Sequence, residues 1–260
     1  MPIITLTTDF GEGSPYVAAM KGVILSINPA ATLVDISHAV PPQDIRQGAM
    51  VLADVAPLFP SGTIHAAVVD PGVGTDRAII LVEIDGQRFI APDNGLVSLL
   101  ARRRAPSRIT VLSERAYWRE RVSATFHGRD IIAPVAARLS LGLDPVLLGP
   151  PKAAIALLDW PEVQIVPGSI AGAVTASDSF GNLITDITSG MLGDVPRGEA
   201  TRIVCGEHET FGIYRTYADQ PPMTLIALVG SSERLELAIV GDSAAIMLGV
   251  PVGTPVTVTW

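Results

Sequence analysis

Apolar and polar positions follow one pattern in the first part of the chain and a different one after about Leu148. In the first part, β-branched apolar runs such as Thr63–Val69 alternate with segments whose apolar residues recur at helical spacing, as Val17, Met20 and Ile24 do. Short connections join these segments in the order strand, helix, strand, helix, strand. This order is typical of an α/β domain in which helices flank a parallel sheet.

Local signals locate several elements within this domain. Ser14 offers an N-cap for the first helix, directly before a proline. The dipeptide Asp85-Gly86 between two apolar runs predicts a β-hairpin. We expect a single helix to open at Phe126–Asp130 and to run to about Leu141, with Asp130 near its start, where the helix dipole favours negative charge.

After about residue 150 the helical spacing disappears, and short strand-like runs are separated by Gly, Pro and Asp. Such spacing indicates a small all-β domain, which we interpret as a barrel. The runs are Val163–Val166, Ser169–Ala176, Thr201–Cys205, Thr224–Val229, Leu235–Val240 and Val256–Trp260. We therefore predict an N-terminal α/β domain over residues 1–155 and a C-terminal β-barrel domain over residues 162–260.

Composition narrows the class of protein. The net charge of −8 argues against nucleic-acid binding, which needs a basic face, and Arg102–Arg104 is the only basic run. The single cysteine, Cys205, excludes an intramolecular disulfide and is consistent with a reducing compartment. The first residues do not form a signal peptide, and no stretch approaches the ~20 apolar residues of a membrane helix. We expect a soluble, cytoplasmic protein that binds neither nucleic acid nor membrane.

Polar residues follow three predicted strands of the α/β domain, with Asp9, Ser37-His38 and Asp70 at the strand ends. In a parallel sheet these ends share one edge, where ligands bind. His127, from a loop before a helix, can reach that edge, and Arg77 lies beyond a Gly-rich turn that follows Asp70. Convergence of Asp, Arg and His is typical of a site that activates water or a hydroxyl. The alternative for Asp70 is that it only caps the Pro-Gly turn, and we assign His38, His65 and His208 structural or solvated roles.

Metal and phosphate sites are weaker alternatives. The chain has no zinc-type His or Cys pair, although Asp9, Asp70 and His127 could form a carboxylate-rich site for a hard metal. Gly72 and Gly74 follow a strand without the rest of a phosphate-binding motif. We expect no metal.

The second domain contains one loop that combines three chemistries. Asp178, Phe180 and Asn182 supply a carboxylate, an aromatic face and an amide within five positions. A purine could stack on Phe180 while Asn182 hydrogen-bonds to its edge. The alternative is a simple turn with Phe180 in the core. Ser231 and Ser232 form another polar loop or a plain turn.

Seven motifs together carry a resemblance that spans both domains in order. They are T-D-F-G at Thr8–Gly11, D-I-S-H-A-V-P-P-Q-D at Asp35–Asp44, H-A-A-V-V-D-P-G-V-G-T at His65–Thr75, A-P-D-N-G-L at Ala91–Leu96, F-H-G-R-D at Phe126–Asp130, D-S-F-G-N-L-I-T at Asp178–Thr185 and S-S-E-R-L-E-L-A at Ser231–Ala238. The chain closely resembles the S-adenosyl-L-methionine (SAM) hydrolases, or SAM hydroxide adenosyltransferases, which are relatives of the SAM-dependent fluorinase and chlorinase.

The resemblance implies an α/β domain, a β-barrel and a homotrimer whose sites lie between the α/β domain of one subunit and the barrel of its neighbour. It implies that water attacks C5′ of the ribose of SAM, giving adenosine and L-methionine, with SAM as substrate and no cofactor. The alternatives are a SAM- or adenosine-binding protein without turnover, a metal-dependent hydrolase, or a halogenase.

The resemblance also implies roles for individual residues. The water-activating set maps onto Asp70, Arg77 and His127, of which the first and last are absent from halogenating relatives. Implied substrate contacts are Asp9 for the ribose hydroxyls, Asp178 for the methionine amine, Ser231 and the adjoining Ser232 for the carboxylate, and Phe180 and Asn182 for adenine. Ser14 stands where many relatives have Asp, and it could still contact the methionine moiety. Either Asp70 or a neutral His127 could take the proton from water.

Overall fold

The computed structural model describes residues 2–260, and its contacts divide the chain into two compact units, the second of which begins at Trp160. The domain limits predicted from sequence, 155 and 162, stay predictions. Each unit is described here by itself. Among the described residues, no helix is long and apolar enough to cross a membrane.

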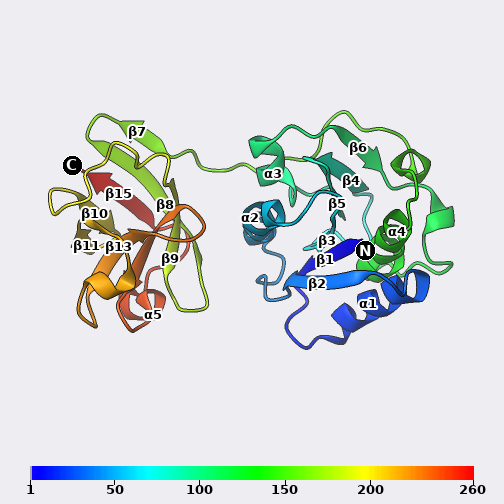
Figure 1. Cartoon of the computed structure of the whole chain (residues 1–260), viewed down its shortest axis with the longest axis horizontal. Coiled ribbons are helices and arrows are strands. Elements are labelled where there is room, and N and C mark those ends of the chain that lie inside the picture. Colours follow the sequence, from blue (N-terminus) through cyan, green and yellow to red (C-terminus); the bar gives the residue numbers. More distant parts are fainter. Residues whose placement is uncertain (1) are drawn as a thin grey trace. The chain divides into compact units, whose positions relative to one another are not determined.

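The first unit is an α/β domain, which confirms the predicted class (Figure 1). Its elements are β1 (Ile3–Thr8), α1 (Pro15–Ile27), β2 (Thr32–Ser37), α2 (Ile45–Val55), η1 (Ala56–Leu58), β3 (Ile64–Val68), β4 (Ile79–Ile84), β5 (Gln87–Pro92), α3 (Ser98–Arg103), β6 (Arg108–Val111), η2 (Arg115–Tyr117), η3 (Gly128–Ile132), α4 (Ala133–Ser140) and η4 (Pro145–Leu148).

The strands of this unit form one sheet in the order β2-β1-β3-β5-β4-β6. Strands β2, β1, β3 and β5 are parallel to one another, whereas β4 is antiparallel to both β5 and β6. The sheet is therefore parallel except for β4. The reversal comes from the predicted hairpin, because Asp85 and Gly86 both take positive φ (49° and 75°), as a two-residue turn between twisted strands requires.

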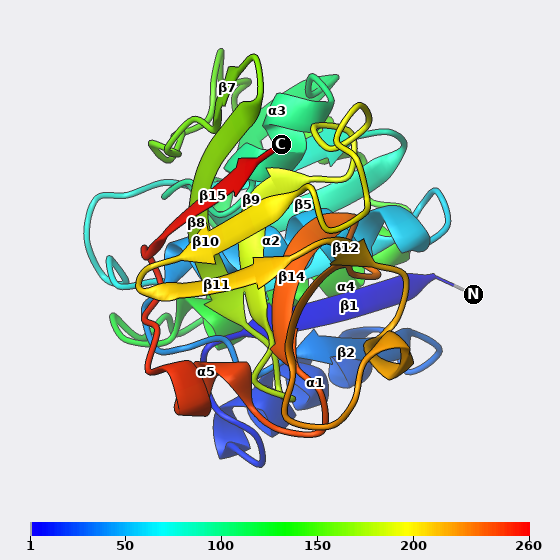
Figure 2. The same ribbon diagram turned by 90° about the vertical axis from the view of Figure 1, so that its left-hand side faces the viewer.

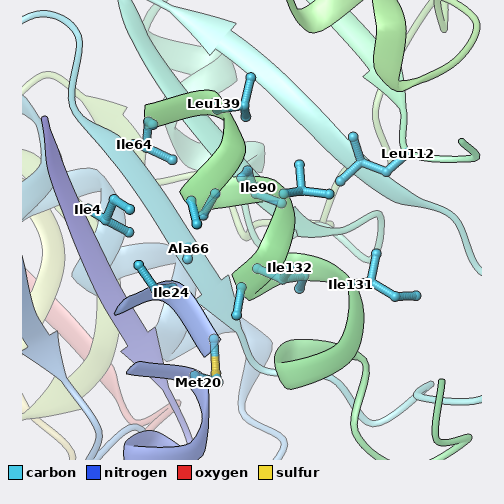
Figure 3. Close-up of a cluster of buried hydrophobic side chains, with 14 of the residues drawn as sticks. Ile4, Met20, Ile24, Ile64, Ala66, Ile90, Leu112, Ile131, Ile132 and Leu139 are labelled. Atoms are coloured by element: carbon cyan, nitrogen blue, oxygen red, sulfur yellow. The ribbon is translucent and has the colours of Figure 1, made fainter. Parts of the chain in front are cut away.

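Alternate residues of β3 face the two sides of the sheet, and each side has its own core. Ile64 and Val68 join a cluster with α1 and α4, which Figure 3 shows in close-up. Ala67 on β3 joins a second cluster with α2 and α3. Burial of one large aliphatic side chain stabilises the fold by roughly 1.5–3 kcal/mol, so these two layers hold the sheet edge in place.

His65 is enclosed within the sheet. It is fully buried, its Nδ1 lies 2.8 Å from Oγ1 of Thr5, and its ring stacks on Phe89 at 4.7 Å between centroids. Burial lowers the pKa of His65 to about 4. The ring is therefore neutral near pH 7 and serves packing.

The predicted helix from Phe126 to Leu141 is in fact two segments. Gly128–Ile132 forms a π-helical turn, in which the N–H of Ala133 bonds to the carbonyl of Gly128, and the α-helix α4 follows it. Pro134 explains the break, since proline has no N–H for the carbonyl four residues earlier, that of Asp130. That carbonyl instead accepts a bond of 2.9 Å from the backbone N–H of Arg119.

The second unit consists mainly of strands, as predicted. Its elements are β7 (Gln164–Val166), β8 (Ser169–Ser177), β9 (Leu183–Thr188), β10 (Arg202–Cys205), β11 (His208–Phe211), β12 (Ile213–Tyr214), η5 (Tyr217–Asp219), β13 (Leu225–Val229), β14 (Arg234–Ile239), α5 (Ala244–Leu248) and β15 (Pro255–Thr259).

Within residues 160–260, all of which the structure describes, nine strands form a nearly closed, barrel-like sheet. Its main path is β11-β10-β15-β8-β9-β14-β13-β12, with β7 beside β8, and Figure 2 shows β15, β10 and β11 side by side. A bond of 2.7 Å from Oγ1 of Thr210 on β11 to the carbonyl of Leu225 on β13 links strands from opposite parts of this path. The sequence did not predict β9, β11 and β12, and His208, expected to be solvated, bonds through Nε2 to the carbonyl of Leu248 at 3.1 Å.

Candidate active site

The carboxyl ends of three parallel strands meet at one edge of the α/β sheet, as expected. The N–H of Asp9, just after β1, bonds to the carbonyl of Val68 at the end of β3 (3.4 Å). The N–H of Gly11 bonds to the carbonyl of His38, just after β2 (2.9 Å). Asp70 follows β3, so all three strand ends contribute to this edge.

Arg77 returns to the same edge because β4 runs antiparallel to β5. The loop from Val69 to Ala78 needs only to pass the end of β5, where the side-chain amide of Asn94 bonds to the carbonyl of Val69 (2.9 Å). Nε of Arg77 then donates to Oδ1 of Asp70 at 2.6 Å, and Nη2 donates to Oδ2. The pair is nearly buried, with 4% of the Asp70 side chain and 11% of the Arg77 side chain exposed. A bidentate, shielded pair of this kind has a fixed orientation.

A glycine lets the Asp70–Arg77 loop approach the segment before His127. Gly74 has a φ of +82°, and a Cβ at this position would collide with the carbonyl oxygen of Ala124. Gly128 is also tightly placed, since a Cβ there would lie 3.2 Å from the sulfur of Met20 and 3.3 Å from Cγ2 of Val68. These contacts bring the start of the π-helical turn against the end of β3.

His127 completes the cluster. Its Nδ1 lies 3.1 Å from Nη2 of Arg77. A guanidinium has only donors, so Nδ1 accepts this bond and the proton of the neutral ring is on Nε2. Burial and the positive charge of Arg77 lower the pKa of His127, and the negative charges of Asp70 and Asp130 only partly oppose this. The imidazole is therefore neutral near pH 7, and the structure joins the three predicted water-activating residues into one connected set.

Two members of the set, Arg77 and His127, border a cavity of about 350 Å³. Arg77 and His127 line it together with apolar side chains that include Leu112, Trp118 and Ile131. Polar groups on an apolar wall are typical of small-molecule sites.

The other two predicted residues of this domain have backbone partners. Oδ2 of Asp9 accepts a bond of 2.8 Å from the N–H of Gln43. Oγ of Ser14 accepts a bond of 3.3 Å from the N–H of Tyr16 and so caps α1. Both side chains are partly exposed, which leaves oxygen lone pairs free for a ligand.

Three aromatic rings beside this edge form a cluster that the sequence analysis missed. Phe10, Tyr16 and Phe126 pack edge to face, with centroids 5.2–5.9 Å apart. Tyr16 is 55% exposed. Phe10 and Phe126 lie within the quoted motifs, and Tyr16 lies five residues after the first of them.

Asp9, Asp70 and His127 do not form the metal site considered as an alternative. Among residues 2–260, the structure shows no group of three or more His, Cys, Asp or Glu side chains placed to hold a metal ion. One oxygen of Asp9 bonds to a backbone N–H, and both oxygens of Asp70 bond to Arg77.

The barrel contains a separate pocket of about 680 Å³, lined by Asp178, Phe180, Asn182 and Ser231 among others. Oδ1 of Asp178 accepts bonds from the backbone N–H groups of Phe180 (2.9 Å) and Asn182 (2.8 Å), and its Oδ2 accepts from Nδ2 of Asn182 (2.9 Å). Because a carboxylate only accepts, the amide of Asn182 must turn its NH₂ toward Asp178, which leaves its oxygen as an acceptor. Phe180 is 79% exposed, so it is not the core residue of the alternative interpretation.

Two further pocket residues were missed by the sequence analysis. The hydroxyl of Tyr217 donates to Oε2 of Glu236 at 3.0 Å, and both side chains line the pocket. Burial raises the pKa of Glu236, and the nearby negative charge of Asp178 acts in the same direction. Burial and the charge of Glu236 raise the pKa of Tyr217 to about 12. The signal for Glu236 was a charged residue inside the apolar run L-E-L-A.

Ser231 and Ser232 lie in the turn between β13 and β14 but differ in position. Ser231 is exposed and lines the pocket. Ser232 is partly buried, and its hydroxyl oxygen is enclosed without a hydrogen-bond partner. The structure therefore brings Ser231, rather than Ser232, to the pocket surface.

Family models match both units. The model of the SAM hydroxide adenosyltransferase N-terminal domain matches residues 4–149, and that of the C-terminal domain matches residues 172–257. The chain belongs to the SAM hydroxide adenosyltransferase family. This confirms the resemblance found in the motifs.

Family relatives agree over almost the whole chain. An (R)-S-adenosyl-L-methionine hydrolase of Salinispora arenicola is 38% identical over 99% of this chain and 98% of its own length. One of Thermus thermophilus is 36% identical over 96% of each chain. A fluorinase of Actinopolyspora mzabensis is more distant, at 28% identity over 78% of this chain and 77% of its own.

A solved structure shares the fold over the full chain. An uncharacterised conserved protein from Thermotoga maritima superposes with a TM-score of 0.93 at 32% identity, covering 100% of both chains.

Proposed function

We propose that this family member hydrolyses S-adenosyl-L-methionine to adenosine and L-methionine. The observation that carries the proposal is the connected set of Asp70, Arg77 and His127 at the sheet edge. Relatives at 36–38% identity that are named SAM hydrolases support it. Fluorinases are also related, but at 28% identity.

The reaction is an in-line displacement. The oxygen of water forms a bond to C5′ of the ribose, the C5′–S bond breaks, and its electron pair returns to sulfur, so that methionine leaves as a neutral thioether. The leaving group needs no proton. The catalytic task is to orient the water, remove one of its protons and align it with the C5′–S bond.

The geometry favours Asp70 as the proton acceptor. Nδ1 of His127 already accepts from Arg77, and its Nε2 therefore carries hydrogen and acts as a donor. A neutral His127 can hold the water through this N–H, while the carboxylate of Asp70, kept in place by Arg77, receives the proton. The reaction has no step that requires a cofactor or metal, and we expect full activity in the presence of a chelator.

We assign the substrate contacts from the family resemblance and from the residues that line the two pockets. The barrel pocket presents two aromatic side chains, one amide oxygen that can accept a hydrogen bond and three carboxyl groups, which suits an adenine ring and a cationic amine. The proposed contacts are Asp9 with the ribose hydroxyls, Ser14 with the methionine moiety, Asp178 with the methionine amine, Ser231 with its carboxylate, and Phe180 and Asn182 with adenine.

Incubation with SAM in ¹⁸O-labelled water tests the reaction. We expect adenosine with ¹⁸O at its 5′ hydroxyl and an equal amount of methionine, separated by chromatography and identified by mass. Recovery of unchanged SAM would show a binding protein. Formation of 5′-chloro- or 5′-fluoro-5′-deoxyadenosine when halide is added would show a halogenase.

We also propose a homotrimer in which the α/β domain of one subunit and the barrel of a neighbour supply the two halves of each site. Mixing an inactive variant with one that binds SAM weakly tests this arrangement. After subunit exchange, and at SAM concentrations below KM, His127→Ala and Phe180→Ala chains together should be more active than the same amount of Phe180→Ala chains alone, because some sites then receive both unaltered halves. Light scattering should give three times the chain mass of 27.3 kDa. Absence of any such increase in exchanged oligomers would contradict shared sites. The cytoplasmic location stays a prediction.

A further inference from the structure

A buried carboxylate holds the loop that leads into His127. Asp130 is 0% exposed, although it lies on the first turn after the loop. Its carboxylate accepts bonds from Nε and Nη2 of Arg129 (2.7 and 2.8 Å), from Nη1 of Arg119 (2.8 Å) and from the backbone N–H of Ser123 (2.9 Å). We call Arg119, Ser123, Arg129 and Asp130 the Asp130 clamp. Sequence analysis had explained Asp130 only by the helix dipole.

The clamp acts on the backbone as well as on side chains. The carbonyl of Asp130, left without a helical partner by Pro134, accepts from the N–H of Arg119 (2.9 Å), and the N–H of Asp130 bonds to the carbonyl of Phe126 (3.2 Å). One residue thus binds the loop at Arg119, Ser123 and Phe126. These bonds hold the loop that precedes His127 to the π-helical turn that follows it.

The held loop in turn contacts the rest of the site. The carbonyl of Ala124, next to Ser123, lies against Gly74 in the Asp70–Arg77 loop. The ring of Phe126 packs on Phe10. The guanidinium of Arg129 lies 5.0 Å from the centre of the Phe126 ring. Displacement of the clamp would therefore move the segment that sets the distance between His127 and Arg77.

We propose that Asp130 is a positioning residue for His127, which it holds in the orientation that accepts the Arg77 hydrogen bond. The effect of Asp130 on turnover rests on the proposed function. Its effect on the orientation and pKa of the His127 ring does not. Asp130 itself does not border the site cavity; it acts through the loop and through its charge.

The charges around His127 set the sign of the expected effect. From the β3–β4 loop these are Asp70, Asp76 and Arg77, from η2 Arg115, and from the clamp Arg119, Arg129 and Asp130. The negative charge of Asp130 raises the pKa of His127. Its removal also leaves two guanidinium groups uncompensated, so both changes lower that pKa. Removal of Arg119 alone leaves the negative charge of Asp130 less neutralised, and this raises the pKa of His127.

Histidine NMR separates this role from a merely structural one. The protein is labelled at its four histidines, the His127 signal is assigned with His127→Gln, and its titration midpoint is measured. Asp130→Asn should lower the midpoint and Arg119→Gln should raise it. Asp144→Asn, which removes a carboxylate that caps the turn η4, should leave it unchanged. With SAM, Asp130→Asn should lower kcat about 10- to 100-fold with KM within about threefold, and should move the acid limb of kcat to lower pH.

An unchanged His127 midpoint in folded Asp130→Asn, or shifts of the same sign in both variants, would overturn the proposal. If Asp130→Asn does not fold, Arg119→Gln decides, because the Arg119 side chain is 45% exposed and tolerates change. An unchanged midpoint and unchanged turnover in that variant would also overturn it. If the parent protein did not cleave SAM, the titration would still test the clamp, and the two failures would be distinguishable.

Discussion

The two units present their polar groups in opposite ways. In the α/β unit, Arg77 donates hydrogen bonds to both Asp70 and His127, and the Asp70–Arg77 pair is almost completely shielded from solvent. In the barrel, Phe180 is 79% exposed at a pocket of about 680 Å³, nearly twice the cavity beside His127. The polar groups of the α/β unit are thus already bonded to one another without a ligand, whereas the barrel pocket exposes aromatic and polar surface that a ligand can cover.

This difference separates two tasks. Groups that are already oriented contribute most when charge moves during the reaction, because they need not reorganise. Open aromatic and polar surface contributes to substrate and transition state alike, and its loss raises KM with little change in kcat. Substitutions in the two units should therefore divide between kcat and KM.

The largest effect is expected from Asp70→Asn. It removes the proposed proton acceptor and leaves the buried guanidinium of Arg77 without its charged partner. We expect kcat to fall about 10²- to 10⁴-fold, with KM for SAM within about threefold. Steady-state kinetics measures both, and Asp85→Asn in the β4–β5 turn is the matched control. A large rise in KM with unchanged kcat would contradict the assignment of the chemical step to the α/β unit and of substrate binding to the barrel.

The next effect concerns stability and belongs to the α/β unit alone. His65 has a pKa of about 4 in the fold against an ordinary value of 6.5. The unfolded chain therefore binds this proton first, and stability is lost as pH falls from about 6.5 to 4. The expected loss is about 3 kcal/mol for this group. Urea unfolding at pH 7 and pH 4 measures it. In His65→Gln the loss over this range should be smaller by that amount, and an equal loss would contradict the assignment.

Phe180→Ala tests the barrel half. Stacking of a base on an aromatic ring contributes roughly 1–3 kcal/mol, so KM should rise at least fivefold while kcat changes less than about threefold. Phe211→Ala removes another exposed barrel aromatic and should change neither value. If Phe180→Ala lowered kcat instead, the barrel would share the chemical task.

The smallest effect is expected from Tyr217→Phe. It removes the hydroxyl that donates to Glu236 and leaves a partly buried carboxylate oxygen without that bond. A hydrogen bond of this kind contributes about 0.5–1.5 kcal/mol, so SAM affinity should fall two- to tenfold. Calorimetric titration on the Asp70→Asn background measures binding without turnover. Affinity equal to that of the parent would show that the pair does not shape the pocket.

Local signals in the sequence were sufficient for much of the fold. The Asp85-Gly86 turn and the helix cap at Ser14 were predicted from their own neighbours and found in place. Strand β9 was missed, although Leu183–Thr188 follows directly on the Asp178–Asn182 loop and alternates apolar and polar residues over part of its length. The short strands β11 and β12 carry too few apolar residues to show a period.

The candidate site was predictable in its members more than in its contacts. Asp70 stood out because a core strand ends there, but its bond to Arg77 depends on the reversal of β4. The contact between Arg77 and His127 joins residues 50 positions apart, which no spacing rule reports. Asp130 shows the limit most clearly: its charge suggested an exposed helix start, whereas two arginines and a backbone N–H hold it in the interior with a pKa of about 2, although burial alone would raise that pKa.

The π-helical turn at Gly128–Ile132 gives the site a register that ordinary helix geometry would not reproduce. A π turn contains one residue more than an α turn, and each residue of an α-helix rotates the chain by about 100°. Deletion of a single residue here would rotate the segment before the turn by about 100° relative to α4, and it would swing the imidazole about a quarter of a circle away from its guanidinium. The contact between Arg77 and His127 therefore depends on the number of residues in this turn as well as on their identity.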